Sequence, residues 1–267
     1  MELFGYAASF LMGITLGMIG GGGSILTVPI LVYLFSVDPV LATAYSLFIV
    51  GLTALAGGVT YLKSGDVDLK TGVTFAIPSF IGVYLVRAFV VPSLPDPVFS
   101  LGSLAVSKAL LIMFVFAVLM VAASFSMIRT PSNAKKKTAL SPASRFALIA
   151  AEGLVVGGVT GFVGAGGGFL IIPALVLLVG LHMKVAVGTS LFIIAAKSLL
   201  GFIGDVQHQA SIEWSMLAVL SAIAIAGLLA GKALSSKVSE RALKKGFGWF
   251  VLVMGLFILF DQLKNLL

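Results

Sequence analysis

Long apolar stretches separated by short polar ones run through the whole chain. A membrane-spanning helix needs about 20 apolar residues, with a range of roughly 17–25. Two of the apolar stretches, 24–36 and 168–180, are about 13 residues long and too short for a comfortable span. The pattern predicts an all-α polytopic membrane protein with eight to ten helical segments. The ten apolar segments are 4–19, 24–36, 41–62, 72–91, 104–128, 144–163, 168–180, 186–204, 213–232 and 246–263.

The two halves of the chain are related to each other. With an offset of 144 residues, 18–58 aligns with 162–202 without a gap, and 15 of the 41 pairs are identical, including Pro29 with Pro173. Because the matched positions include glycine, proline and serine, apolar bias alone does not explain them. The sequence therefore predicts an internal repeat of about five helical segments in each half. The predicted division is an N-terminal repeat at 1–128, a basic linker at 129–143 and a C-terminal repeat at 144–267.

Lysine and arginine are concentrated in alternate loops, as they are on the cytoplasmic side of membrane proteins. Placing the linker inside puts 13 of the 17 basic residues in inner loops, whereas the predicted outer loops at 37–40, 92–103 and 205–212 contain none. The two halves then start from opposite sides. We therefore expect inverted repeats in the cytoplasmic membrane with both termini outside. Whether 4–36 and 144–180 cross fully or form re-entrant hairpins stays open.

Composition agrees with a membrane protein. Hydrophobic residues make up 60% of the 267 residues and charged residues 10%, with a mean hydropathy of +1.17, too apolar for a soluble domain. Cysteine is absent, and His182 and His208 form no metal motif. We expect no metal, no cofactor, no catalytic residue and no enzyme activity. The net charge of +7 is explained by loop orientation, so no nucleic-acid partner is expected.

A glycine cluster precedes each short segment. Interrupted helices in inverted repeats are typical of secondary transporters, whose substrates bind near the bilayer midplane. Glycine permits a sharp turn and close approach of a ligand, and the N–H groups at the following helix start favour an anion. The alternative is that these glycines only allow close helix packing. The candidate binding residues here are Gly20, Gly21, Gly22, Gly23, Ser24, Gly164, Gly166, Gly167 and Gly168.

Two charged residues lie inside predicted spans. Lys197 is near the centre of segment 186–204, where a charge costs at least about 2.5–3.5 kcal/mol on insertion scales. It marks either a substrate pathway, where it would favour an anion, or a structural ion pair; its repeat counterpart is Thr53. Glu152 could pair with Lys197, carry a coupling proton, or only make a hydrogen bond between helices.

Hydroxyl groups and other charges complete the candidate set. Ser46, Thr189 and Ser190 could line a cavity or bond their own helix backbone. Arg87 is expected to extend its charge to the outer membrane surface, as is Lys108. Three polar residues are expected to be solvated in an outer loop: Asp205, His208 and Glu213.

The stretches GMIGGGGSILTVPILVYL (17–34) and GFVGAGGGFLIIPALVLLVGL (161–181) are each followed by a Ser-Leu-Phe segment. As a pair they resemble the duplicated glycine–proline motifs of the TauE/SafE sulfite exporter family, and the resemblance covers essentially the whole chain. It implies a multi-pass transporter that exports sulfite, sulfoacetate or related organosulfur anions without ATP hydrolysis. The family's glycine motifs carry onto Gly20–Gly23 and Gly164–Gly168.

The sequence thus predicts a secondary transporter for a small anion, with alternating access around a midplane site. The expected substrate is sulfite or an organosulfonate such as sulfoacetate. An anion channel and a cation-coupled transporter of another small substrate remain as alternatives. The expected partners are the anion and membrane lipid, and a homodimer is left open.

Overall fold

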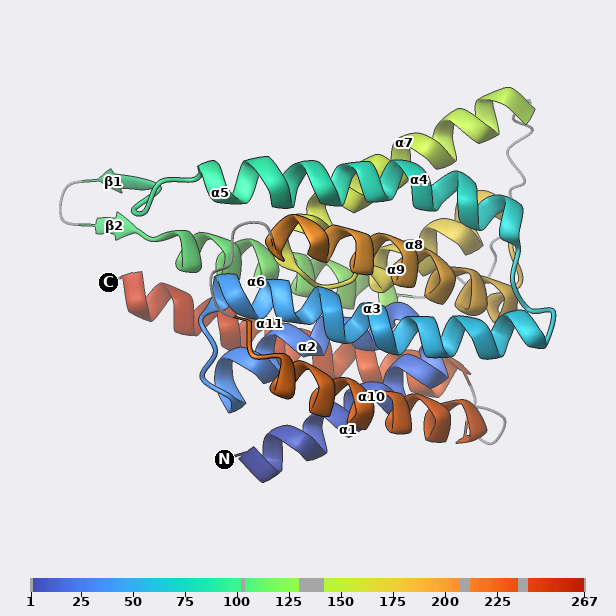
Figure 1. Cartoon of the computed structure of the whole chain (residues 1–267), viewed down its shortest axis with the longest axis horizontal. Coiled ribbons are helices and arrows are strands. Elements are labelled where there is room, and N and C mark those ends of the chain that lie inside the picture. Colours follow the sequence, from blue (N-terminus) through green and yellow to red (C-terminus); the bar gives the residue numbers. More distant parts are fainter. Residues whose placement is uncertain (1, 102–103, 130–141, 207–211, 235–239, 267) are drawn as a thin grey trace.

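The computed structural model describes residues 2–101, 104–129, 142–206, 212–234 and 240–266. Figure 1 shows helices running along one common direction, with both chain ends at the same end of the bundle. The first half contains α1 (Glu2–Ile19), η1 (Gly21–Leu26), α2 (Thr27–Pro29), η2 (Ile30–Leu34), α3 (Pro39–Lys63), α4 (Leu69–Leu85), η3 (Val86–Val90), α5 (Val91–Ser93), β1 (Phe99–Leu101), β2 (Leu104–Val106) and α6 (Lys108–Ile128). The second half contains α7 (Pro142–Val163), α8 (Gly168–Ala174), η4 (Leu175–Val179), α9 (Met183–Val206), α10 (Trp214–Leu234) and α11 (Glu240–Leu266).

The predicted all-α membrane architecture is confirmed. Each predicted apolar segment coincides with a helical segment, and six of the described helices are long and apolar enough to cross a membrane. Large apolar side chains cover their outer surfaces, for example Ile77, Val253 and Phe260, which are 57%, 62% and 70% exposed. Such surfaces suit lipid rather than water. The predicted linker lies mostly at 130–141, outside the described residues.

One predicted boundary is wrong. The segment 104–128 was expected to be helical throughout, but 104–106 forms β2, which pairs with β1 in a two-stranded antiparallel hairpin. The helix α6 begins only at Lys108, because the Ser107 side chain accepts a hydrogen bond from the Leu110 backbone N–H and caps it.

Each half opens with a helical hairpin that has a glycine turn at its tip. In the first half, the chain turns at Gly20 and returns through η1, α2 and η2. The Tyr6 and Phe35 rings, near the two open ends of this hairpin, lie 5.4 Å apart. In the second half, Ile149 near the start of α7 and Val179 at the end of η4 belong to one buried cluster. Each hairpin therefore finishes at the end of the bundle where it begins (Figure 1).

The returning limbs share a local distortion. Pro29 and Pro173 lie in the equivalent short helices α2 and α8, and a π-helix follows each of them, η2 and η4. Proline has no N–H and its ring crowds the preceding turn, so a wider turn next to it relieves the conflict. The same irregularity recurs because the same residue recurs at the repeat offset.

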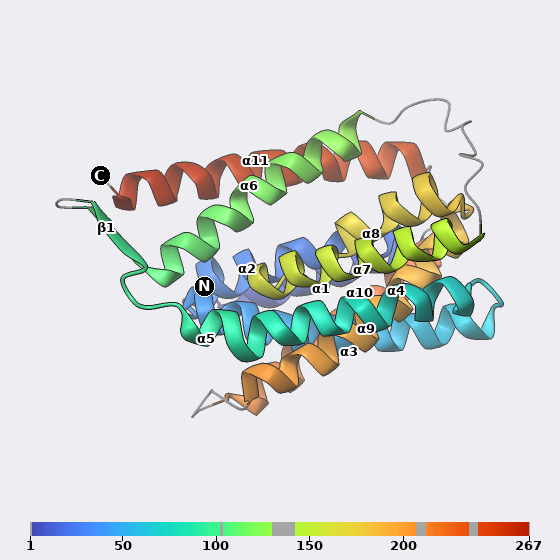
Figure 2. The ribbon, with the colours of Figure 1, turned by 90° about the horizontal axis from the view of Figure 1, so that it is seen from above.

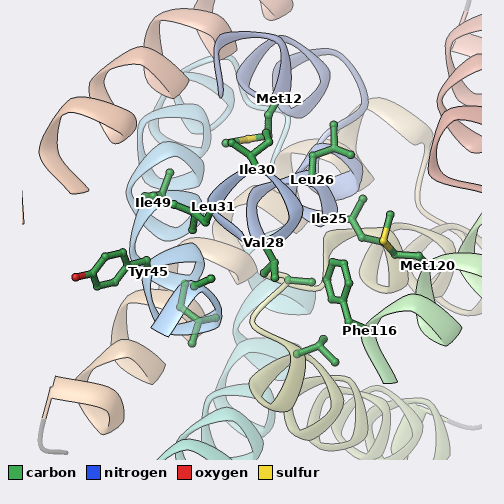
Figure 3. Close-up of a cluster of buried hydrophobic side chains, with 14 of the residues drawn as sticks. Met12, Ile25, Leu26, Val28, Ile30, Leu31, Tyr45, Ile49, Phe116 and Met120 are labelled. Carbon is green, nitrogen blue, oxygen red and sulfur yellow. The ribbon is translucent and has the colours of Figure 1, made fainter. Parts of the chain in front are cut away.

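Protein surrounds the first returning limb (Figure 3). Its side chains Ile25, Val28 and Leu31 are at most 1% exposed. Met12 of α1 and Phe116 of α6 pack around it in the same buried cluster. Irregular backbone is tolerated at membrane depth only under such cover.

The closely packed helix pairs follow the repeat. They are α4 with α7, α1 with α10, α3 with α9 and α6 with α11, the last seen side by side in Figure 2. The counterparts in the two halves are α1 and α7, α3 and α9, α4 and α10, and α6 and α11. If each helix is replaced by its counterpart, the α4–α7 pair becomes α10–α1, and the α3–α9 and α6–α11 pairs stay the same. This pattern of contacts is the one expected from a two-fold relation between the halves.

Two hydrogen bonds show the same correspondence between the halves. The Glu213 backbone N–H, just before α10, donates to Tyr45 Oη at 2.8 Å, and the Asp68 backbone N–H, just before α4, donates to Thr189 Oγ1 at 2.9 Å. Tyr45 and Thr189 are equivalent positions. These bonds support a two-fold arrangement; opposite orientation of the halves in a membrane stays a prediction.

Glycines let α4 and α7 approach closely, which generates a prediction with a neighbouring control. A β-carbon on Gly157 would lie 2.1 Å from Ser79 O, whereas one on Gly158 meets only Val86 Cγ2 at 3.9 Å. We expect Gly157→Ala to lower the free energy of unfolding by about 1–3 kcal/mol through overpacking. Gly158→Ala should be neutral or raise it by up to about 1 kcal/mol. Thermal unfolding in detergent measures both; equal effects would contradict the packing.

Candidate functional site

The two glycine turns adopt backbone conformations that other residues rarely adopt. Gly20 has φ +75°, and Gly167, the residue before α8, has φ +74°. After the first turn the chain forms the 3₁₀-helix η1, and after the second it forms α8. Ala165 interrupts the second cluster without preventing the turn, and it is fully buried. The structure therefore places both predicted glycine clusters at helix breaks.

The tips of the two hairpins touch each other in the interior. A β-carbon on Gly21 would lie 2.2 Å from Gly168 Cα, and one on Gly166 would lie 3.3 Å from Ser24 Cβ. Any side chain at Gly21 or Gly168 would force the turns apart. The structure thus brings the two predicted glycine clusters together at one place, built from both halves.

Each turn also rests on the central helix of the other half. A β-carbon on Gly20 would lie 3.2 Å from Ser190 Oγ of α9, and one on Gly164 would lie 2.4 Å from Thr43 O of α3. Ser46 is the repeat counterpart of Ser190, one helical turn from Thr43 on the same face of α3. The site is therefore an interlocked structure, with each hairpin tip lying against a helix of the opposite half.

Lys197 lies beside the second turn. Its side chain is fully buried, and Nζ donates a hydrogen bond to Thr160 Oγ1 of α7 at 2.6 Å. A β-carbon on Gly167 would lie 2.7 Å from that Nζ. Among the described residues, no acidic side chain forms an ion pair with Lys197. A buried ammonium with three donors and one neutral partner is suited to a negatively charged ligand.

Lys197 also stands at the centre of the repeat. The helices α3 and α9 cross antiparallel, with Gly51 against Leu199. Two residues forward from Gly51 on α3 and two residues back from Leu199 on α9, this register places Thr53 at the same depth as Lys197. Thr53 and Lys197 are repeat counterparts, so the exchange axis passes through their level. Thr53 donates its hydroxyl to Ile49 O at 2.6 Å, which leaves the lysine as the charged member of the pair.

The predicted hydroxyls fall into two groups. Ser24 Oγ donates to Gly21 O at 2.6 Å and Ser190 Oγ donates to Val187 O at 2.8 Å, so both protons serve their own backbone while the oxygens face the turns. Ser46 Oγ is buried with no hydrogen-bond partner among the described residues. Thr189 lies elsewhere: it holds the start of α4 through Asp68, eight residues and about 12 Å along α9 from Lys197.

The structure does not pair Glu152 with Lys197. Lys197 is bonded to Thr160, eight residues and about two turns along α7 from Glu152. Glu152 is half-buried, and its Oε2 has no partner among the described residues. The hypothesis of a Glu152–Lys197 ion pair is therefore wrong, whereas a proton-carrying role for Glu152 stays a prediction.

The expectations for Arg87 and Asp205 are also wrong. Arg87 does not extend toward the surface: it is 1% exposed and pairs through Nη1 with Asp205 Oδ1 at 3.2 Å and Thr43 Oγ1 at 2.9 Å. Asp205 is not in a solvated loop, because α9 continues to Val206 and buries it. Glu213 is exposed as expected, and His208 lies outside the described residues.

A signal for this pair was present in the sequence. Asp205 stands one residue beyond the predicted segment 186–204, and Arg87 stands near the predicted outer end of its own segment. Opposite charges at the same predicted depth favour pairing over separate solvation. Thr160 carried no signal, because a threonine in a membrane helix most often bonds its own backbone.

A cavity of about 600 Å³ opens at the end of the bundle that carries the chain termini. Tyr45, one of its lining residues, lies eight residues and about 12 Å along α3 from the level of Thr53 and Lys197. Access from this end thus reaches part of the way to the interlocked turns. Its lining residues are Tyr6, Phe35, Ser36, Val37, Asp38, Leu41, Tyr45, Glu213, Ser215, Met216 and Val219.

Comparison with known proteins gives one consistent class. The profile of the family described as "Sulfite exporter TauE/SafE" matches residues 6–258. A "Probable membrane transporter protein" of Xylella fastidiosa (strain Temecula1) is 27% identical over 263 residues, covering 96% of this chain and 94% of that protein. The "Probable membrane transporter protein YunE" of Bacillus subtilis (strain 168) is 29% identical over 259 residues, covering 88% and 92%. No solved structure shows a significant match.

The contact between Gly167 and Lys197 can be tested against a glycine with the same backbone conformation. Gly167→Ala would strain the left-handed turn by about 1–2 kcal/mol and would press against Thr160 and Lys197. Gly180 has φ +77° but no atom within 4 Å of its β-carbon position. We therefore expect Gly167→Ala to unfold at a lower temperature than Gly180→Ala in detergent. Equal melting temperatures would mean that Gly167 is needed only for its backbone angle.

Proposed function

We propose that the substrate of this protein is a small anion. The premise is that the chain belongs to the sulfite exporter TauE/SafE family and is a membrane transporter rather than an enzyme. The proposed substrates are sulfite or an organosulfonate such as sulfoacetate, moved outward by secondary transport. The observation that carries this proposal is the Lys197 ammonium, fully buried at the repeat centre beside a glycine turn, with only a hydroxyl as its described partner.

The chemistry of the site suits an oxyanion. Charge-assisted hydrogen bonds from an ammonium to an anionic oxygen are short and strong. The glycine turns present backbone without side chains, so an anion can approach their N–H groups closely. Ser24 and Ser190 retain oxygens beside the turns, and a protonated oxygen of the substrate could donate to them. Ser46 is placed to contribute a free hydroxyl from α3.

The two-fold packing supports alternating access. Because each turn rests on a helix of the opposite half, a rocking of one half against the other would expose the turns first to one side and then to the other. An anion that leaves an inside-negative cell gains roughly 2.3 kcal/mol per charge per 100 mV. The membrane potential alone can therefore drive export, and a doubly charged anion gains twice as much as a singly charged one.

Removing the Lys197 charge should weaken anion binding. Hydrogen bonds to charged groups contribute about 1.5–3 kcal/mol, so we expect Lys197→Met to weaken sulfite binding at least about tenfold. The control Lys184→Met removes the same charge from an exposed lysine at the start of α9 and should bind normally. Thermal-shift titration of purified protein with sulfite, sulfoacetate, sulfate and chloride measures both. Unchanged sulfite affinity in folded Lys197→Met would remove the lysine from the site.

The same protein distinguishes a carrier from a channel. In proteoliposomes, a carrier shows saturable sulfite flux with counterflow, whereas an anion channel shows large single-channel currents. Currents of that kind would contradict alternating access while leaving the anion site in place.

The proposed orientation can be measured because the chain has no cysteine. Ser64 in the α3–α4 loop and Ser93 at the end of α5 are both exposed. The α3–α4 loop and α5 lie at opposite ends of the bundle (Figure 1). We expect Ser93→Cys to react with a membrane-impermeant maleimide on intact cells. Ser64→Cys should react only after the cells are opened. The reverse result would place the termini inside.

A further inference from the structure

Arg87 is a second buried cation at the interface of the two halves. It lies where α4 widens into the π-helix η3, and its side chain is fully buried. Gly204 of α9 approaches it closely, since a β-carbon there would lie 3.1 Å from Arg87 Cβ. The position is thus enclosed by α3, α4 and α9, and it is not open to lipid or to bulk water.

The donors of Arg87 are only partly used. Both of its contacts, with Asp205 Oδ1 and Thr43 Oγ1, go through Nη1. Nε and Nη2 are fully buried, and neither has a hydrogen-bond partner among the described residues. The edge formed by Nε–H and Nη2–H is the part of a guanidinium that binds a planar or tetrahedral oxyanion with two parallel hydrogen bonds.

A structural ion pair alone would be arranged differently. A carboxylate that serves only to neutralise arginine commonly takes the two-pronged geometry with two guanidinium nitrogens. Here a single nitrogen holds both Asp205 and Thr43, and the two-pronged edge is left over. The repeat does not impose the carboxylate either. The helix contacts make Lys232 of α10 the counterpart of Arg87. Lys232 Nζ lies 4.5 Å from the ring centroid of Tyr61, the counterpart of Asp205.

The cluster is continuous with the second glycine turn. Thr43 accepts the hydrogen bond from Arg87, and its backbone lies against Gly164. Three residues later in that turn, Gly167 lies against Lys197. Asp205 and Lys197 are eight residues apart on α9, which sets the two cations about 12 Å apart in depth. Arg87 is in η3, directly before α5, and α5 lies toward the end of the bundle that carries the chain termini (Figure 1).

From this geometry we infer that the Nε–Nη2 edge of Arg87 is a second oxyanion-binding station, which the transported anion occupies after it leaves Lys197 on its way to the side of the termini. This inference rests on the proposed function and extends it. Asp205 and Thr43 hold the guanidinium in place through Nη1, so the anion does not need to displace them. Because one glycine turn separates the two stations, the anion can be released from Lys197 before it leaves Arg87.

Proteoliposome transport of radiolabelled sulfite tests this inference. Arg87→Lys keeps the charge and can still meet Asp205, but it loses the two-pronged edge. We expect kcat/KM for sulfite to fall at least about tenfold, the loss of one charge-assisted contact, while sulfite still raises the melting temperature through the Lys197 site. Transport by Arg87→Lys at the wild-type rate would overturn the inference.

A matched pair of variants separates binding from structure. Arg87→Gln/Asp205→Asn removes both charges and leaves two hydrogen-bonding side chains of similar shape. A purely structural ion pair predicts that this double variant is folded and transports sulfite like wild type, which would overturn the inference. We expect it to be folded and defective in transport.

Arginine modification tests the same point without any variant. Arg87 is enclosed in this conformation, so in reconstituted wild-type protein it should react with phenylglyoxal only as the transport cycle opens its station, and saturating sulfite should protect it where chloride does not. The exposed Arg129 is the internal control and should react equally in both. An Arg87 that never reacts, or that sulfite does not protect, would overturn the inference. Wild-type protein that neither binds nor transports sulfite would instead refute the proposed function.

Discussion

Irregular backbone inside an apolar bundle has to be shielded from lipid, and the two glycine turns shield each other. An unsatisfied N–H or C=O at membrane depth costs several kcal/mol. Neither turn could be covered by its own hairpin alone, since each hairpin has only two limbs. The contact of Gly21 with Gly168, and of each turn with α3 or α9 of the opposite half, supplies the cover. The site is consequently a joint product of both halves.

This requirement explains why the turns are made of glycine. A β-carbon on either Gly21 or Gly168 would overlap the opposing backbone, at 2.2 and 2.0 Å. The glycines in the long helices have the simpler role of helix packing, as Gly157 shows against Ser79. Both interpretations of glycine in membrane helices thus apply to this chain, at different positions.

The pattern of apolar residues was sufficient to predict the helical segments, because each is a local property of the sequence. Ser190 and the glycine clusters were also found from the repeat alone. The partners of charged residues were not, since Lys197 meets Thr160 and Arg87 meets Asp205 across 37 and 118 residues. Such pairings depend on how helices cross, and a single sequence without covariation carries little information on crossing. The end of α9 was missed for a related reason: Asp205 interrupts the apolar pattern, yet its charge is compensated by a helix distant in sequence.

The repeat provides a symmetric framework, and the charges make it asymmetric. Lys197 corresponds to Thr53 and Asp205 to Tyr61, so neither of these two charges has a charged counterpart in the other half. A ligand can shift a conformational equilibrium only by the difference of its affinities for the two states. On the proposed function, an anion supplies the countercharge that Thr160 does not provide to Lys197. It would therefore stabilise whichever conformation admits it to the lysine, and this is how occupancy of the site would become linked to movement of the two halves.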